Sequence, residues 1–260
     1  MANYWAERQA KTQKALTEKS VKQTEIQLAL YYNRAMKKIL GQFESIYNEV
    51  FSKLSEGKTI SPADLYKLDT YWQIQGQLRD ELQKLGDKEV AALSKNFMLQ
   101  YQGIYEAIAL KGETSTFNTA NVEIANQLIN SIWCADGKSW SQRIWENTAE
   151  LQETLNATLV DCVITGKKPT ELKKLLQERF SVSYSRADAL VRTEMSHIQN
   201  EAARQRYEDY GIQYVEVWAD KDERRCEVCA KLHQKRYPIG AAVPIPAHTN
   251  CRCSIVPVIE

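Results

Sequence analysis

The sequence lacks the signatures of export and of membrane insertion. Its first eight residues, Met-Ala-Asn-Tyr-Trp-Ala-Glu-Arg, contain no apolar core of the signal-peptide kind, and no run of eighteen apolar residues occurs among the 260 residues. We therefore expect the protein to fold in a reducing cytoplasm and to contact no membrane. In that setting Cys134 and Cys162 are expected to be small buried hydrophobic residues and not a disulfide pair.

Common catalytic motifs are also missing. The sequence contains no glycine-rich phosphate loop, no HExxH and no GxSxG pattern, so the usual signatures of nucleotide-binding proteins, zinc proteases and serine hydrolases are absent. The net charge is only +1, which gives no global electrostatic footprint for nucleic acid. Residues 1–38 carry eight Lys or Arg against three Glu, but a solvated helix face has the same pattern.

Glycine and proline are absent from the first forty residues, which favours one long helix there. With 43% hydrophobic and 26% charged residues, the composition is that of a globular protein with a sizeable core. Periodic apolar positions predict helices over residues 1–55, 62–85, 87–111, 118–133, 140–163, 172–180 and 183–211.

The first predicted helix has two halves. Residues 1–25 have few apolar positions and are interpreted as an exposed arm, with Trp5 either anchored on a partner or folded back. The second half has apolar residues at spacings of three and four and must pack. These residues are Ile39, Leu40, Phe43, Ile46, Tyr47, Val50, Phe51 and Leu54.

Local signals set the predicted helix ends. Residues 55–58, Gly86 and Gly112 are expected to stop helices, and Ser61-Pro62-Ala63-Asp64 is a strong start signal. Ser183 is expected to cap the last long helix.

The periodicity changes after Gly211. Residues 214–218 alternate and are rich in β-branched and aromatic residues, so they predict a strand. Residues 252–258 predict another, which Pro257 restricts to a sheet edge or a strand end.

Four of the six cysteines and two of the three histidines lie in residues 226–253. Cys226-x2-Cys229 is followed after 18 residues by His248-x2-Cys251-x-Cys253. A Cys-x2-Cys turn can direct two thiolates at one ion, about 2.3 Å from each sulfur, and a second cluster completes the tetrahedron that Zn2+ prefers. The spacing therefore predicts a zinc knuckle.

Five candidate ligands for four positions favour a closed, structural zinc site over a catalytic one. We expect Cys226, Cys229 and Cys251 to be ligands, with either His248 or Cys253 as the fourth. Two disulfides are the alternative, which suits a small secreted domain better than this chain.

The predicted fold class is mainly α: an elongated multi-helix body with a small C-terminal α+β module stapled by the Cys/His zinc knuckle. The expected domains are an N-terminal helix or arm at 1–60, a helical body at 61–166 and a C-terminal domain at 167–260. Glu194 and His197 share one helix face. We interpret them as polar residues that dock against the small sheet, and an acid–base pair is the alternative.

The C-terminal part resembles a known family. The residues that carry the resemblance are Val191-Arg192-Thr193-Glu194, Asn200, Val217-Trp218, Asp222, the two Cys/His clusters and the segment Pro246 to Cys253. Together they are similar to the minor head proteins of tailed phages, typified by Mu protein F, over roughly residues 150–260. The proline that often directly precedes the histidine in the family is here separated from it by Ala247.

The resemblance implies a structural, non-enzymatic role in head morphogenesis. Its implied partners are the portal protein and a major capsid or scaffolding protein, and some members contact packaged double-stranded DNA. The implied location is the capsid interior or portal vertex, with the host cytoplasm before assembly. Because seven residues follow Cys253, no appended effector domain is expected.

Two other functions stay open from the residues alone. One is a zinc-dependent nuclease or other hydrolase that uses His248 at an open zinc position and Glu194 as base. The other is a zinc-ribbon DNA-binding regulator. This alternative is weaker because the only basic residues between the two clusters are Lys231, Lys235 and Arg236.

Overall fold

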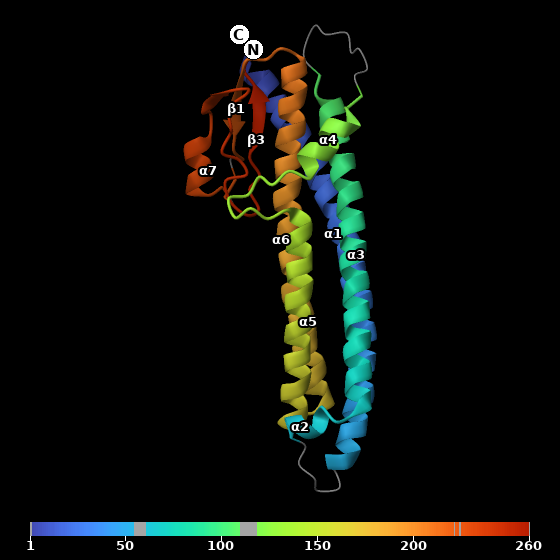
Figure 1. The fold of residues 1–260 in the computed structure, drawn as a ribbon. Helices are drawn as coiled ribbons and strands as arrows, with labels where there is room; N and C mark the ends of the chain where they lie inside the picture. Colours follow the sequence, from blue (N-terminus) through green and yellow to red (C-terminus); the bar gives the residue numbers. More distant parts are fainter. Residues whose placement is uncertain (1, 55–60, 110–118, 221, 224, 260) are drawn as a thin grey trace. The chain divides into compact units, whose positions relative to one another are not determined.

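The computed structural model describes residues 2–54, 61–109, 119–220, 222–223 and 225–259 (Figure 1). These residues form long helices and one small antiparallel sheet near the C-terminal end. The predicted fold class, a mainly helical body with a small C-terminal α+β module and a Cys/His cluster, is confirmed. Within the described residues, no helix has both the length and the apolar character needed to cross a membrane.

The chain divides into two compact units. Unit 1 comprises Met1–Glu25, Ala92–Trp140 and Asp188–Glu260, and unit 2 comprises Ile26–Ala91 and Ser141–Ala187. The predicted domain boundaries after residues 60 and 166 stay a prediction.

Unit 2 contains segments of four long helices: α1 (Ala2–Leu54), α3 (Asp69–Ala107), α5 (Trp140–Ile164) and α6 (Pro169–Asp209). Their apolar faces form its core, as the predicted spacing of three and four requires. Buried members are Leu28, Ile39, Phe43, Ile46, Tyr47, Leu78, Leu82, Leu155, Leu159 and Leu176. The predicted inward positions Val50, Phe51 and Leu54 lie outside the residues whose side chains are described.

The start signal at Ser61 is confirmed, but the helix it opens is short. Ser61 and Asp64 form a reciprocal capping box at α2 (Pro62–Leu65), which ends after about one turn before α3 begins. Trp72 is 59% exposed, and its indole Nε1 donates to the Tyr66 carbonyl at 2.8 Å.

Two predicted helix boundaries are wrong. Gly86 lies inside α3, and a Cβ at this position would come within 2.5 Å of the Trp145 ring. The glycine therefore permits close approach of α5 and does not end the helix. Ser183 lies inside α6 and is buried, with its Oγ 3.4 Å from the Tyr32 hydroxyl. The predicted stops at residues 55–58 and Gly112, and the helix start at Asn118, lie outside the described residues.

Unit 1 includes the first part of α1, the end of α3, the short helix α4 (Val122–Ile129) and the last turns of α6. The prediction of an exposed arm over residues 1–25 is wrong. Gln13 is fully buried and its Nε2 donates to the Tyr207 hydroxyl at 2.9 Å and to the Ile255 carbonyl at 3.0 Å. Because its amide is hydrogen-bonded, a glutamine can occupy this buried position. The apolar spacing of the sequence therefore did not predict that this part of the helix is buried.

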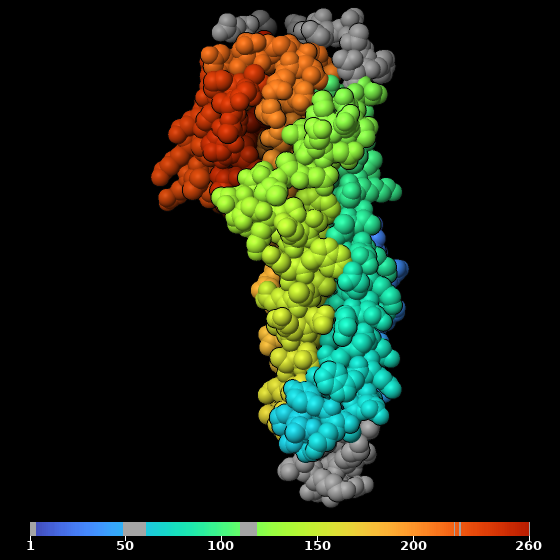
Figure 2. Space-filling model, viewed as in Figure 1, coloured from blue at the N-terminus to red at the C-terminus, as the bar shows by residue number. Residues whose placement is uncertain are grey.

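The sheet has the order β2-β1-β3 and is antiparallel throughout. Both predicted strands are confirmed as β1 (Tyr214–Trp218) and β3 (Ser254–Pro257), with β3 at an edge and Pro257 at its end. The sequence did not predict β2 (Arg236–Pro238) or helix α7 (Glu227–Leu232). Figure 1 shows β1 and β3 beside the C-terminal turns of α6, and Figure 2 shows the red C-terminal residues massed against the orange turns of that helix.

Candidate metal centre

The first Cys cluster is built on the start of α7. Cys226 is the N-cap residue, and its Sγ accepts a hydrogen bond from the Cys229 backbone N–H at 3.4 Å. One short helical turn thus brings both sulfurs to the same end of the helix, the geometry that a Cys-x2-Cys knuckle needs. The helix places Cys229 in a buried position and leaves Cys226 partly exposed.

The second cluster is held by α6. Asn250 has a positive φ of 61°, which Asn tolerates in turns, and its N–H donates to Thr193 Oγ1 at 3.0 Å. The buried Asn200 side chain donates to the Cys253 carbonyl at 3.0 Å and accepts from the Ile255 N–H at 2.9 Å. Two polar residues of one helix therefore fix the backbone on both sides of Cys251.

A bidentate ion pair joins the second cluster to the segment before the first. Arg252 donates to both carboxylate oxygens of Asp222 at 2.7 Å, and its Nη1 lies 3.1 Å from Asp220 Oδ2. A two-pronged guanidinium–carboxylate pair fixes orientation as well as distance. Apart from their place in the family motif, no sequence signal indicates the roles of Thr193, Asn200 and Arg252.

The five predicted ligands come together. Their ligand atoms form two groups that share Cys229, one with Cys226 and His248 and the other with Cys251 and Cys253, and within each group the atoms lie within 4.8 Å of one another. His248 Nε2 lies 3.2 Å from Cys226 Sγ and 3.1 Å from Cys229 Sγ, and the sulfurs of Cys229 and Cys251 are 3.8 Å apart.

The orientation of His248 suits a ligand. Its Nδ1 lies 2.7 Å from the Thr249 carbonyl oxygen, which can only accept a hydrogen bond, so Nδ1 carries the proton. Nε2 then presents its lone pair to the sulfurs of Cys226 and Cys229. Such a hydrogen bond to the second ring nitrogen is typical of metal-binding histidines.

The electrostatics of the thiols are uneven. A hydrogen bond from the Cys253 thiol lowers the pKa of Cys251 to about 5, while the same hydrogen bond to Cys251 raises the pKa of Cys253. The backbone N–H of Cys229 lowers the pKa of Cys226, whereas burial raises the pKa of Cys229 to about 12.

The donor set fits a tetrahedral soft-metal ion. Sulfurs about 2.3 Å from a tetrahedral centre lie about 3.8 Å from each other, which equals the separation of Cys229 and Cys251. Thiolates and an imidazole nitrogen are the ligands that Zn2+ prefers. The cluster can therefore hold a metal, as the spacing predicted.

Glu194 and His197 share a face of α6, and Trp133 contacts both side chains. Docking of this face against the sheet stays a prediction. The Trp133 indole donates to Glu194 Oε2 at 3.0 Å and its ring stacks on His197, with centroids 4.4 Å apart. Burial lowers the pKa of His197 to about 4, so the imidazole is neutral at pH 7. Among the described residues, neither side chain belongs to the groups of potential metal ligands.

Residues 153–256 match the family model described as phage Mu protein F like protein. Over this stretch the chain is similar to the Mu F-like family. It is a family of phage head morphogenesis and minor capsid proteins. No curated protein and no solved structure matches the chain.

The Mu F-like region contains the whole metal centre and the helix that supports it. The structure shows hydrogen bonds for three residues of the family motif. Thr193 and Asn200 bond the backbone of the second cluster, and Asp222 accepts from Arg252. Glu194, the acid of the same motif, packs against Trp133, which lies outside the segment that carried the resemblance.

Proposed function

We propose that the protein is a structural minor capsid protein of a tailed phage or prophage, without enzymatic activity of its own. It would associate with the portal and the inner capsid during head assembly. The observation that carries this proposal is the Mu F-like match over residues 153–256. Contact with packaged double-stranded DNA is a further part of the proposal, and the local cationic excess of residues 1–38 supports it.

The test is mass spectrometry of capsid precursors purified from cells that express the surrounding gene cluster. We expect this chain in the same particle fraction as the portal protein, at a few copies per particle. Absence from every particle fraction would overturn the proposal. Zinc-dependent turnover of DNA, RNA or peptide that Glu194→Gln abolishes would replace it with the hydrolase function.

We further propose a structural zinc ion held by Cys226, Cys229, His248 and Cys251. His248 Nε2 lies 3.2 Å from Cys226 Sγ and 3.1 Å from Cys229 Sγ, and Cys229 Sγ lies 3.8 Å from Cys251 Sγ. The hydrogen-bonded tautomer of His248 supports its choice as fourth ligand. Bound zinc would contribute folding energy to the module, on the order of 10 kcal/mol. The backbone segments that carry the proposed ligands are held in place by Thr193, Asn200 and Asp222.

Metal analysis of the purified protein tests this part separately. One zinc per chain is expected, and the Cys226→Ser/Cys229→Ser double variant should lose both the metal and the cooperative unfolding of the C-terminal module. A double variant that kept its zinc content and melting temperature would overturn the zinc site and leave the head-assembly proposal standing.

A further inference from the structure

Three aromatic side chains form a cluster in unit 2, where the short helix α2 is followed by α3 (Figure 1). They are Tyr66, Tyr71 and Trp72, and their ring centroids lie between 5.2 and 6.4 Å apart. No role discussed so far uses this cluster.

The cluster has a fixed base. Tyr71 is buried, and its hydroxyl donates to Asn156 Oδ1 on α5 at 3.0 Å. The Trp72 indole donates from Nε1 to the Tyr66 carbonyl at 2.8 Å, and its ring meets the Tyr71 ring edge to face. The indole is therefore held in one orientation by a hydrogen bond and by a ring contact.

The two outer rings are open to solvent. Tyr66 is 44% exposed and Trp72 is 59% exposed. The single donor of the Trp72 indole is already bonded within the protein, so the need to hydrate a polar group does not explain the exposure of this ring. Rigid, exposed Trp and Tyr side chains supply much of the binding energy of protein interfaces. The pair thus forms an interaction surface.

The charge beside these rings is negative. The faces of aromatic rings carry partial negative charge and attract cations. Asp69 is exposed and opens α3 three residues before Trp72, so the two side chains are neighbours on one helix face. Within the described part of the chain, the Asp69 carboxylate has no ion pair and no side-chain hydrogen bond.

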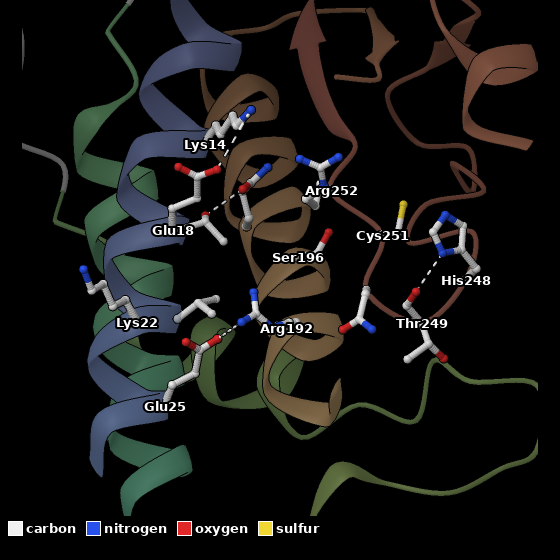
Figure 3. A pocket seen from close by; sticks show the side chains of 14 residues that line it. Lys14, Glu18, Lys22, Glu25, Arg192, Ser196, His248, Thr249, Cys251 and Arg252 are labelled. Atoms are coloured by element: carbon white, nitrogen blue, oxygen red, sulfur yellow. Dashed lines mark hydrogen bonds and ion pairs between the residues drawn. The ribbon is translucent and has the colours of Figure 1, made fainter. Parts of the chain in front are cut away.

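Charged residues in other exposed or partly exposed positions have partners of opposite charge. Lys67, the cation next to Tyr66 in the chain, lies 3.2 Å from Asp64. In the cleft beside the metal centre of unit 1, Glu25 is paired with Arg192 (Figure 3). Asp69 differs from these carboxylates because its charge is free to meet a ligand, and that ligand would also contact an exposed ring.

We propose that Tyr66, Asp69 and Trp72 form a docking site for an arginine side chain of a partner protein. The guanidinium would stack on the Trp72 ring and donate to the Asp69 carboxylate. A guanidinium can do both at once because it is planar and carries its donors at its edge. An apolar side chain would cover the rings and leave the Asp69 charge without a counter-ion. The site goes beyond the head-assembly proposal and does not depend on which protein supplies the arginine.

The test uses the isotope-labelled full-length protein and the peptide acetyl-Gly-Gly-Arg-Gly-Gly-amide. Two-dimensional NMR follows the indole N–H signal of Trp72, which the variant Trp72→Leu identifies by its disappearance. We expect this signal to shift progressively as peptide is added. The Trp140 indole is the internal control, because it is buried and bonded to the Ile129 carbonyl. Its signal should not move.

Two further peptides separate charge from apolar contact. One carries citrulline, the uncharged isostere of arginine, and the other carries leucine in the same position. Both should bind roughly fivefold more weakly than the arginine peptide, since neither brings a cation to the rings.

Two variants test the site while keeping the Trp72 signal. Asp69→Asn keeps the shape and removes the charge, and should weaken binding of the arginine peptide roughly twofold to fivefold. Tyr66→Leu removes one ring and keeps the backbone carbonyl that holds the indole, and should weaken binding by a similar factor. Asp87→Asn is the matched control, because it alters another exposed aspartate of α3, roughly 27 Å further along the helix. It should leave binding unchanged.

Three outcomes would overturn the proposal. They are a Trp72 signal that the arginine peptide does not move, a citrulline or leucine peptide that binds as tightly, and an Asp69→Asn variant with wild-type affinity. A protein that enters particles with the portal but binds no arginine peptide would refute this docking site and leave the proposed function intact.

Discussion

Glu89 is a carboxyl group in the core of unit 2. It is fully buried, and its Oε2 accepts from the Tyr32 hydroxyl at 3.4 Å, which in turn accepts from Asn147 Nδ2 at 3.1 Å. Burial raises the pKa of Glu89 from its ordinary value of 4.5 to about 8. Three helices thus each contribute one residue to a buried polar cluster. Apolar periodicity could not predict this cluster, because the sequence does not distinguish a buried Glu on α3 from an exposed one.

The raised pKa predicts a pH-dependent stability. Between pH 4.5 and about 8 the unfolded chain loses the Glu89 proton while the folded chain keeps it, so the free energy of unfolding falls as pH rises. The total loss should be roughly 5 kcal/mol across this window. Denaturant unfolding of wild type and Glu89→Gln at several pH values measures it: the difference in stability between the two should change with pH.

The matched control is Glu44→Gln, which alters an exposed glutamate of α1 in the same unit. It should leave the pH profile of stability as in the wild type. A Glu89→Gln variant whose stability difference from wild type is the same at pH 5 and pH 8 would contradict the assignment.

Cys253 is the fifth candidate ligand and, in our proposal, the spare one. Cys253→Ser should therefore keep one zinc per chain, whereas Cys251→Ser and His248→Ala should lower the zinc affinity by at least tenfold. Competition with a chromogenic chelator, followed by elemental analysis, gives both affinity and stoichiometry. Loss of zinc in Cys253→Ser with retention in His248→Ala would make Cys253 the fourth ligand.

At the scale of the elements, α3 illustrates where local signals fail. Gly86 has the appearance of a helix stop, yet α3 continues through it because the close approach of Trp145 leaves no room for a Cβ. Helix propensity is a local, weak preference, and packing across unit 2 overrides it. The ends predicted at residues 163 and 211, by contrast, agree with the ends of α5 at Ile164 and α6 at Asp209, and each is followed by a glycine with positive φ, Gly166 and Gly211.

The two glycines of α3 in unit 2 should respond in opposite directions to the same substitution. Gly86→Ala should destabilise by about 1–3 kcal/mol, because the new methyl group would overlap the Trp145 ring. Gly76→Ala, with nothing within 4 Å of its Cβ position, should stabilise by up to about 1 kcal/mol. Chemical denaturation of both variants tests the pair, and equal effects would refute the packing explanation.

The sequence predicted the helices, two strands and the ligand cluster because each has a local pattern: apolar spacing, alternation, or Cys and His spacing. It did not predict β2 and α7, which are too short to show a period. It also gave no role to Thr193 or Asn200, since their hydrogen bonds join residues more than fifty positions apart. The exposed arm predicted over residues 1–25 is wrong for the same reason, because the hydrogen-bond partners of Gln13 lie far along the chain.

At the scale of the molecule, the Mu F-like region covers only part of unit 1. Unit 1 also contains Met1–Glu25 and Ala92–Trp140, which lie outside residues 153–256. An expressed fragment of residues 153–256 should bind an apolar dye and unfold without a cooperative transition, even with zinc. Calorimetry against the full-length protein measures this, and a fragment that unfolds cooperatively at the wild-type temperature would contradict it.

The hydrogen bond from Gln13 to Ile255 has a consequence for inheritance. The two residues are separated by 242 positions in the chain, so almost any recombination event within the gene falls between them. A crossover that brought in a first helix without a donor at position 13 would leave the Ile255 carbonyl and the Tyr207 hydroxyl without this partner in the core. We therefore expect the two ends of the gene to be exchanged together when it recombines with a related gene.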